Sequence, residues 1–461
     1  MDGGRQKIQL ELAFPTEGRG EAPRVVGEGT EASVADRKSE NPVSTEQLME
    51  EVCKRENLKK ALKRVKSNGG SPGIDGMKVG DLSTYLKSHW PTYREQLLRE
   101  TYRPQPVKRV EISKPDGGVR KLGIPTVMDR FIQQAMLQVL QSRWDYTFSA
   151  YSYGFRPLRS AHQAVTQAQQ YITSGYNYVV DIDLEKFFDK VNHDRLMSTI
   201  AKRVEDKRML KLIRAYLVAG VMENGLVSPT EKGTPQGGPL SPLLSNIVLD
   251  ELDRELEARG HKFVRYADDC NIYVRTERAG HRVMRSITRF IEGKLKLKVN
   301  EAKSAVDRPW NRKFLGFSYT FGSEVKRRIS PKALERFKVR VRELTRRSRG
   351  VSISQMVEQL SKYLQGWGNY YGYCQTPSVL EKLDSWIRRR LRCAYWKQWK
   401  RGRTRFKRLR SLGLNKDLAA KMAGSAKGLW RLSQSLALSI ALPGAYFESL
   451  GLPRLAARVA T

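Results

Sequence analysis

The chain has 461 residues, 40% of them hydrophobic, which is enough for about three domains of ordinary size, each with its own core. Its 84 Lys and Arg against 48 Asp and Glu give a formal charge of +36, which is costly unless a polyanion such as nucleic acid, or secondly an anionic membrane, shares it. No apolar run approaches the roughly 18 residues of a spanning helix, and no signal-peptide core is present, so we expect a cytoplasmic protein. The four cysteines are scattered and form no CxxC pair, which argues against a Cys-rich zinc site and for free thiols.

The first half of the chain alternates between helical and extended patterns. Residues 1–45 are rich in Gly, Glu and Ser and are expected to form a disordered leader. Helical spacing begins near residue 46 behind a Ser/Thr cap and is broken by "GGSPGIDGM". Residues 107–124 read as a hairpin around a Pro-Asp-Gly-Gly turn, and residues 128–144 carry apolar residues at the three and four spacing of a helix.

The same mixture continues through the middle of the chain. "YNYVVDIDL" (176–184) predicts a strand, residues 241–260 predict a helix, and "FVRYADDCNIYV" (263–274) predicts a hairpin. The helices and strands do not repeat at a fixed interval up to about residue 325. We therefore expect the α+β fold class for this part of the chain.

The last third of the chain is basic and helical. Residues 331–461 hold 28 Lys and Arg but only 7 Asp and Glu, a net charge of +21. In "DSWIRRRLRCAYWKQWK" the apolar Ile387, Leu391 and Ala394 form one stripe, and aromatic residues such as Trp396 and Trp399 are interleaved with basic ones. We predict nucleic-acid contacts through phosphate pairing and base stacking, the alternative being a solvated helix with a Trp-anchored core. The predicted contacts are Arg388, Arg389, Arg392 and Lys397.

Two pairs of carboxylates stand in strand-like surroundings. Asp268 and Asp269, if about 4 Å apart, repel by roughly 4 kcal/mol at an effective dielectric near 20. They could simply form a hairpin turn, partly neutralised by Arg265. Asp181 and Asp183 lie two residues apart and hence on one face of a strand. Convergence of the two pairs would suit Mg²⁺, and two such ions serve an in-line displacement at a primer hydroxyl.

Five motifs carry a resemblance to a known family. In chain order they are "LGIPTVMDRFIQQA", "SYGFRPLRSAHQAV", "GTPQGGPLSPLLSNIVLDELD", "YADD" and "KFLGF". Together they resemble the reverse transcriptases encoded within group II introns, also called maturases, over residues 46 to 410. The resemblance implies a right-hand polymerase of fingers, palm and thumb that copies RNA into DNA and assists the splicing and mobility of its intron RNA.

The resemblance also implies an order of domains. Residues 46–325 would form the fingers and palm, 326–410 the helical thumb or maturase domain, and 411–461 a short basic DNA-binding extension. The chain shows none of the paired Cys and His residues of the family's C-terminal endonuclease. We therefore expect a form without that domain, which takes its primer from a nascent strand or from an end that other machinery supplies.

Three of the carboxylates match the family's metal ligands. Asp183 stands five residues before Phe188 and six before Asp189, which is the family's spacing, so Asp183, Asp268 and Asp269 would hold two Mg²⁺ ions. Asp181 does not fit this spacing and is the fallback ligand. The implied partners are group II intron RNA, an RNA template with a DNA primer, target DNA and dNTPs, with no membrane.

The nucleotide site is likewise implied by the resemblance. Phe188 would lie under the sugar and exclude a 2′-hydroxyl, although it could instead be a core aromatic, a role that suits Phe187 better. Gln236 and Gly237 of the "PQGG" turn would approach the sugar closely, the alternative being a plain Pro/Gly turn. The triphosphate contacts would be Lys114 and Arg120, which flank the "PDGG" turn and otherwise are ordinary solvated bases.

Two other functions fit the same motifs. One is a related reverse transcriptase that serves DNA repair or defence without an intron. The other is a maturase that acts mainly as an RNA-binding splicing factor with a vestigial polymerase. The intact aspartates argue against the vestigial polymerase, because a lapsed site has no reason to tolerate their repulsion.

Overall fold

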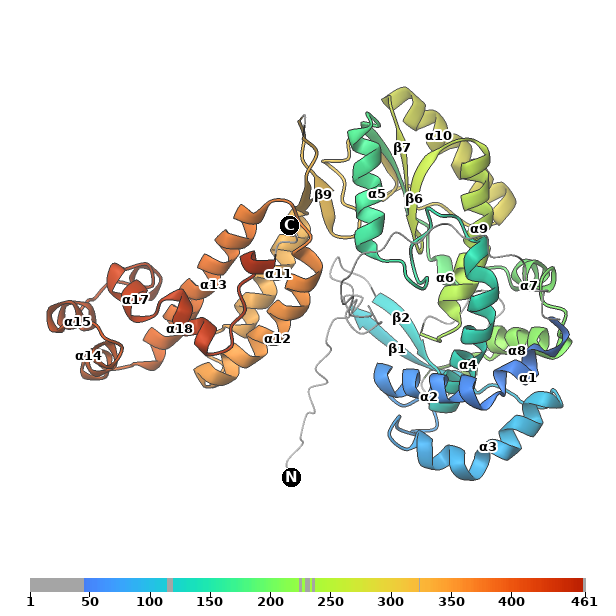
Figure 1. Ribbon diagram of the computed structural model, residues 1–461, viewed down its shortest axis with the longest axis horizontal. Helices are drawn as coiled ribbons and strands as arrows, with labels where there is room; N and C mark the ends of the chain where they lie inside the picture. The colour runs from blue at the N-terminus through green and yellow to red at the C-terminus, as the bar shows by residue number, and fades with distance from the viewer. Residues whose placement is uncertain are drawn as a thin grey trace, which may run out of the picture. The chain divides into compact units, whose positions relative to one another are not determined.

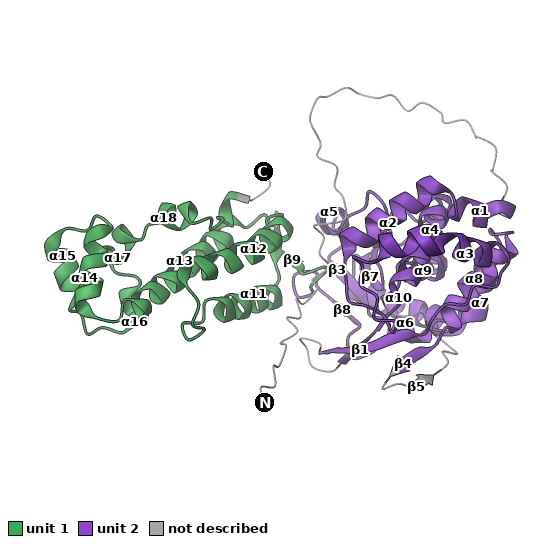
Figure 2. Cartoon of the chain, turned by 90° about the horizontal axis from the view of Figure 1, so that it is seen from below, with its two compact units in different colours: residues 1–21, 313–461 green, residues 22–312 purple. Residues whose placement is uncertain are grey.

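The computed structural model describes residues 45–113, 119–223, 226–228, 233, 237–322 and 324–458. These residues divide into two compact units, one that runs to Arg312 and one that begins at Lys313 (Figure 2). The division falls at the start of the "KFLGF" motif. Residues 411–458 belong to the same compact unit as the helices that precede them.

Helices at the start of the first unit pack around one buried helix, α4 (Val127–Trp144). Thr126 caps α4 by accepting a hydrogen bond from the Asp129 backbone N–H. The helix expected from residue 46 is interrupted near Cys53, so it forms two helices rather than one. The surrounding elements are η1 (Thr45–Gln47), α1 (Leu48–Val52), α2 (Arg55–Asn68) and α3 (Leu82–Leu98).

The first sheet contains the predicted hairpin of residues 107–124. Strands β1 (Val107–Ser113) and β2 (Val119–Ile124) are antiparallel, with Ser113 opposite Val119. β1 also pairs in parallel with β4 (Val221–Glu223), which in turn pairs with β5 (Leu226–Ser228). The order is β2-β1-β4-β5.

The second sheet has the order β6-β7-β3-β8, and all its strand pairs are antiparallel. Its strands are β3 (Tyr178–Ile182), β6 (Lys262–Tyr266), β7 (Asp269–Val274) and β8 (Ala305–Asp307). Val180, Ile182 and Ile272 share one face, which is buried in the core. Helices α5 (Ala161–Thr173), α9 (Ser241–Ala258) and α10 (Glu277–Phe290) pack against this sheet (Figure 1). The opposite face carries the acidic side chains.

Close packing explains the glycine in α10. A Cβ atom on Gly280 would lie 2.5 Å from Cγ1 of Val306 in β8, so only glycine lets the helix approach the sheet this closely. Shorter elements complete the unit, namely η2 (Asp145–Thr147), α6 (Phe187–Lys190), α7 (His193–Ala201), α8 (Lys207–Val218) and η3 (Ile291–Leu295).

The second unit is helical apart from a short hairpin of β9 (Phe317–Tyr319) and β10 (Arg327–Ile329). The predicted apolar stripe is confirmed, because Ile387, Leu391 and Ala394 are all buried. Its helices are α11 (Pro331–Leu344), α12 (Ile353–Tyr371), α13 (Pro377–Gln398), α14 (Gly402–Ser411), α15 (Lys416–Ala423), α16 (Leu429–Leu432), α17 (Leu436–Ala441), α18 (Gly444–Ser449) and η4 (Ala456–Arg458).

All four cysteines are buried free thiols, as the sequence predicted. Over the described ranges, we find no helix with the length and apolar character needed to cross a lipid bilayer.

Candidate active site

Asp268 and Asp269 lie at the tip of the hairpin formed by β6 and β7. Tyr266 pairs with Asp269, so the turn consists of Ala267 and Asp268 alone, and Ala267 has a φ of 57°. Two-residue turns with a positive φ match the twist of the strands they connect. The turn that the sequence offered as an alternative to a metal site is therefore present, and it presents both carboxylates at one end of the sheet.

Arg265 does not neutralise these carboxylates, contrary to the alternative considered above. It is fully buried and forms a two-pronged pair with Asp253 of α9, at 2.7 Å from Nε to Oδ1 and 2.6 Å from Nη2 to Oδ2. Burial alone would lower the pKa of Arg265, but the attraction and hydrogen bonds of Asp253 outweigh it and raise that pKa. Nη1 also donates to the Ala267 carbonyl at 2.8 Å. Arg265 thus fastens the carboxylate turn from behind.

Asp183 lies beside this turn. The last residue of β3, Ile182, pairs with Cys270, so the next position along β3 stands next to Asp269 and on the same face of the sheet. The backbone of Asp183 is held on both sides. Its N–H donates to Ser304 Oγ at 3.0 Å, and its carbonyl accepts from the Asn300 N–H at 2.8 Å. Residues far apart in sequence therefore bring Asp183 and the hairpin tip together.

Asp181, the fallback ligand, shares the face of Asp183 but is committed elsewhere. Its Oδ2 accepts from Arg312 at 2.6 Å from Nη2 and 3.0 Å from Nε. Both side chains are about a quarter exposed. The guanidinium neutralises Asp181, which leaves Asp183 as the stronger candidate on this strand.

The donor set at this end of the sheet is suited to a hard cation. Carboxylate oxygens come from Asp183, Asp268 and Asp269, and these are the ligands that Mg²⁺ prefers. Asn271 follows Asp269 by two residues on the same face, and within the described residues its buried Oδ1 has no hydrogen-bond donor. The side chains of the described residues are not gathered into a group of three or more His, Cys, Asp or Glu that could hold a metal. The strand register and the carboxylate chemistry of Asp183, Asp268 and Asp269 fit Mg²⁺.

The two adjacent phenylalanines of α6 occupy different environments. Phe187 is buried in the core, as predicted, whereas Phe188 is only partly buried. Their rings meet edge to face, with centroids 5.3 Å apart. Phe188 is therefore supported by the core while part of its surface stays accessible, which the predicted sugar contact requires.

Two described glycines of the "GTPQGG" motif, Gly233 and Gly237, lie close to other parts of the backbone. The Gly233 N–H donates to the Val191 carbonyl at 2.8 Å, and a Cβ on Gly233 would lie 2.7 Å from the Phe188 carbonyl oxygen. Gly237 has a φ of 130°, and a Cβ there would clash with the carbonyl oxygen of Gly123 in β2. Gly237 therefore allows a close approach to the β2 backbone, and its predicted close approach to a nucleotide stays a prediction.

Three of the predicted nucleotide contacts cannot be placed. Lys114 and Gln236 lie outside the described residues. Arg120 pairs with Ile112 through its backbone, but its side chain also lies outside the described part of the chain.

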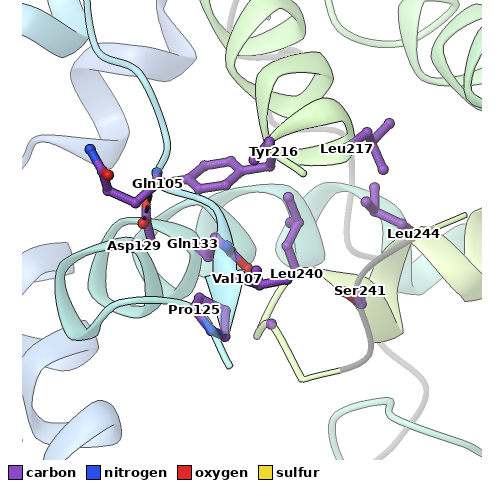
Figure 3. A pocket seen from close by; sticks show the side chains of 12 residues that line it. Gln105, Val107, Pro125, Asp129, Gln133, Tyr216, Leu217, Leu240, Ser241 and Leu244 are labelled. Carbon is purple, nitrogen blue, oxygen red and sulfur yellow. Dashed lines mark hydrogen bonds between the residues drawn. The ribbon is translucent and has the colours of Figure 1, made fainter. Parts of the chain in front are cut away.

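A small cavity in the first unit is too small to hold a nucleotide. It has a volume of about 20 Å³, roughly the space of one water molecule, and Figure 3 shows Asp129, Gln133 and Tyr216 among its lining residues. Asp129 Oδ1 accepts from the Tyr102 hydroxyl at 2.7 Å, and burial raises the pKa of this carboxyl in spite of such hydrogen bonds. The acidic residues at the hairpin tip are not among those that line the cavity.

The predicted nucleic-acid contacts on α13 differ in accessibility. Arg389 lies 3.6 Å from the Trp430 ring centre and donates to the Trp430 carbonyl at 3.0 Å. Arg392 donates to the Leu442 carbonyl at 3.0 Å from Nε and 2.9 Å from Nη2. Both therefore fasten the C-terminal helices to α13. Lys397 is exposed and Arg388 is partly exposed.

Two of the aromatic residues beside these bases belong to the core, whereas Trp386 and Tyr395 are only partly buried. Trp396 is 1% exposed and Trp399 is 7% exposed, so neither ring is open for stacking on bases. These two side chains therefore follow the alternative that the sequence left open, in which tryptophans anchor the core of the helix.

Sequence reasoning missed four residues around Asp183. Asn271, Asn300, Ser304 and Arg312 contact the acidic end of the sheet or hold its backbone. Asn271 carried a weak signal, because a polar residue two positions after Asp269 interrupts an apolar strand. The other three stand more than a hundred residues from β3 in sequence, and spacing gives no sign of such contacts.

Two family models match the chain in succession. Residues 112–319 match "Reverse transcriptase (RNA-dependent DNA polymerase)", and residues 334–413 match "Group II intron, maturase-specific domain". The first match runs from the end of β1 to β9 and includes the acidic hairpin. The mixed helices and strands together with this match confirm the predicted α+β, right-hand polymerase fold.

Curated relatives agree with these matches. Protein YkfC of Escherichia coli K12 is 33% identical over 57% of this chain and 79% of its own length. The group II intron-encoded protein LtrA of Lactococcus lactis is 37% identical over 44% of this chain and 34% of its own length. A putative COX1/OXI3 intron 2 protein of Saccharomyces cerevisiae is 34% identical over 40% of this chain and 21% of its own length. The chain thus spans about a third or less of the last two relatives, and it belongs to the family of group II intron-encoded reverse transcriptases and maturases.

Proposed function

We propose that Asp183, Asp268 and Asp269 hold two Mg²⁺ ions for RNA-directed DNA synthesis and that the RNA copied is that of a group II intron. The observation that carries the proposal is the strand register, in which the end of β3 stands next to the tip of the β6–β7 hairpin. Two Mg²⁺ ions that are held jointly require carboxylates from both segments.

The protein's own residues prepare this site before any ligand arrives. Arg265 holds the hairpin turn through the Ala267 carbonyl, and the Asn300 N–H and Ser304 Oγ hold the backbone of Asp183. When bound, Mg²⁺ supplies charge stabilisation at the attacking hydroxyl and the leaving pyrophosphate. The residues that hold the backbone of the metal ligands matter because the reaction slows when these ligands are loosely held.

Selection of the nucleotide falls to Phe188 in this proposal. Its ring is backed by Phe187 and by the close approach of Gly233 to the Phe188 carbonyl. A ring supported in this way cannot yield to a 2′-hydroxyl, so dNTPs would be favoured over NTPs.

Intron RNA is the proposed partner of the second unit, with the primer and target DNA as further ligands. The maturase-domain match and the net charge of +21 over residues 331–461 support this assignment. The proposed phosphate contacts on α13 are Arg388, Arg389, Arg392 and Lys397, and Arg389 and Arg392 also hold the C-terminal helices to α13.

Primer extension on an RNA template with Mg²⁺ tests the metal assignment. Asp268→Asn should lower the rate by more than the roughly 100-fold that is typical for loss of an outer partner of a metal site. Asp417→Asn, the same exchange at an exposed position of α15, serves as the control and should leave the rate unchanged. Equal rates for Asp268→Asn and the unaltered protein would reject the proposed ligands.

A further inference from the structure

One guanidinium connects strand β3 with the turn that holds Asp183. Arg312 donates from Nη2 and Nε to Asp181 Oδ2, at 2.6 and 3.0 Å, and from Nη2 to the Lys303 carbonyl at 2.8 Å. We infer that Arg312 is a positioning residue for the metal ligand Asp183. This inference rests on the proposed function, since it takes Asp183 to be a ligand.

The turn of residues 300–304 transmits the contact to Asp183. The Lys303 and Ser304 N–H groups both donate to the Asn300 carbonyl, at 3.1 and 2.9 Å, which closes the turn on itself. Asn300 and Ser304 then grip the carbonyl and the N–H of Asp183. Because Arg312 holds the Lys303 carbonyl in the same turn, its loss would free the turn that fixes the Asp183 backbone.

Charge supplies a second reason for Arg312 to act on this site. Asp181 and Asp183 share one face of β3 and lie about 7 Å apart along the strand, at roughly 3.4 Å per residue. Without the positive charge of Arg312, Asp181 would add a fourth negative charge next to the three proposed ligands and would compete with them for the ions. Pairing with Arg312 withdraws Asp181 from that competition.

The geometry calls for arginine rather than any cation. One planar guanidinium reaches both the Asp181 carboxylate and the Lys303 carbonyl, whereas a lysine ammonium is a point charge on a flexible stem. Arg312→Lys should therefore keep the neutralisation of Asp181 but weaken the grip on the turn. Its effect should fall between those of the unaltered protein and Arg312→Gln.

Metal binding by the full chain without nucleic acid is the main test. We would titrate Mn²⁺ into Arg312→Gln and follow free Mn²⁺ by electron paramagnetic resonance. The expected result is a dissociation constant raised about 10- to 100-fold, as for loss of other outer partners of a metal site. The Mg²⁺ concentration for half-maximal primer extension should rise in parallel.

Two companion variants separate positioning from simple loss of fold. Arg308→Gln makes the same exchange in the same segment, where Arg308 instead packs 3.9 Å from the Tyr178 ring centre, and it should leave Mn²⁺ affinity unchanged. Ser304→Ala removes the acceptor of the Asp183 N–H and keeps the ion pair, so it should weaken Mn²⁺ binding even if Arg312→Gln proves unstable. Adding Asp181→Asn to Arg312→Gln should restore part of the affinity, because it removes the unpaired charge.

Unchanged Mn²⁺ affinity in both Arg312→Gln and Ser304→Ala, with intact thermal melting, would overturn the inference. That result is distinct from failure of the proposed function, which would appear as full activity in Asp268→Asn. Loss of activity in Asp268→Asn together with normal metal binding in the other two variants would reject the role of Arg312 alone.

Discussion

Backbone pairing alone brings Asp183 and Asp269 to the same end of the central sheet. Because Ile182 pairs with Cys270, the register leaves no freedom in where the next residue of β3 stands. A slip of one residue would turn these carboxylates into the core, where Val180 and Ile272 now lie. The buried apolar face thus specifies the acidic one, and the energy that places the carboxylates is hydrophobic.

The discrimination between sugars should depend on the Phe188 side chain. Phe188→Ala is expected to raise the use of NTPs relative to dNTPs by about tenfold or more. An apolar pocket typically disfavours a substrate that carries one extra small group by roughly 10- to 200-fold. Competitive incorporation of dNTPs and NTPs on an RNA template measures this ratio.

Phe187→Leu is the matched control for Phe188→Ala. Phe187 is 3% exposed and belongs to the core, so its exchange should lower thermal stability and leave the nucleotide ratio unchanged. A ratio that stays constant in Phe188→Ala would assign the selection to another residue.

Single residues also show how far a sequence can be interpreted. The turn at the paired aspartates and the burial of Phe187 could be predicted, the first because Asp favours turns and the second from the family resemblance. The structural partners of Arg265, Arg389 and Gly237 could not. These partners are Asp253, the Trp430 carbonyl and the β2 backbone, which no local pattern in the sequence indicates.

At the scale of elements, the buried pair of Arg265 and Asp253 connects the hairpin to α9. Hydrogen bonds from Arg265 to Asn246 Oδ1 at 3.0 Å and to Ser152 Oγ at 2.8 Å occupy its remaining donors. Such a pair has a large desolvation cost on both sides. Its benefit is geometric, because three separate segments are fixed around the carboxylate turn.

Breaking this pair on one side should be costly. Arg265→Met is expected to lower the free energy of unfolding by about 3–5 kcal/mol, because Asp253 would be left buried and unpaired. Adding Asp253→Leu should recover much of that loss, since no buried charge remains. Urea denaturation followed by circular dichroism provides the measurement.

Arg254→Met is the control for this element. Arg254 lies on the same helix and pairs with Asp250, but its side chain is 54% exposed. Arg254→Met should therefore lower the free energy of unfolding by only about 0.2–1 kcal/mol. Equal losses at Arg254 and Arg265 would contradict the view that burial gives the pair its importance.

At the scale of the whole molecule, positive charge and acidic chemistry are separated along the chain. The proposed ligands lie before Arg312, whereas residues 331–461 hold a net charge of +21. The described bases of α14 are largely exposed, and in this part of the structure Arg403, Lys407 and Arg408 form no ion pair with a carboxylate. A surface of this kind is suited to phosphate backbones rather than to internal pairing.

Salt dependence should reveal this surface. Exchange of Arg403, Lys407 and Arg408 to Gln is expected to weaken RNA binding and to reduce the slope of log K against log salt by about 2 to 3, since each phosphate contact contributes roughly 0.7 on a single strand and 0.9 on a duplex. Binding of a structured intron-like RNA, titrated at several salt concentrations, gives the slope. Replacing Arg403 and Arg408 by Lys preserves the charge and should keep the slope of the unaltered protein. A slope that the Gln exchanges leave unchanged would mean that α14 stays in solvent when RNA is bound.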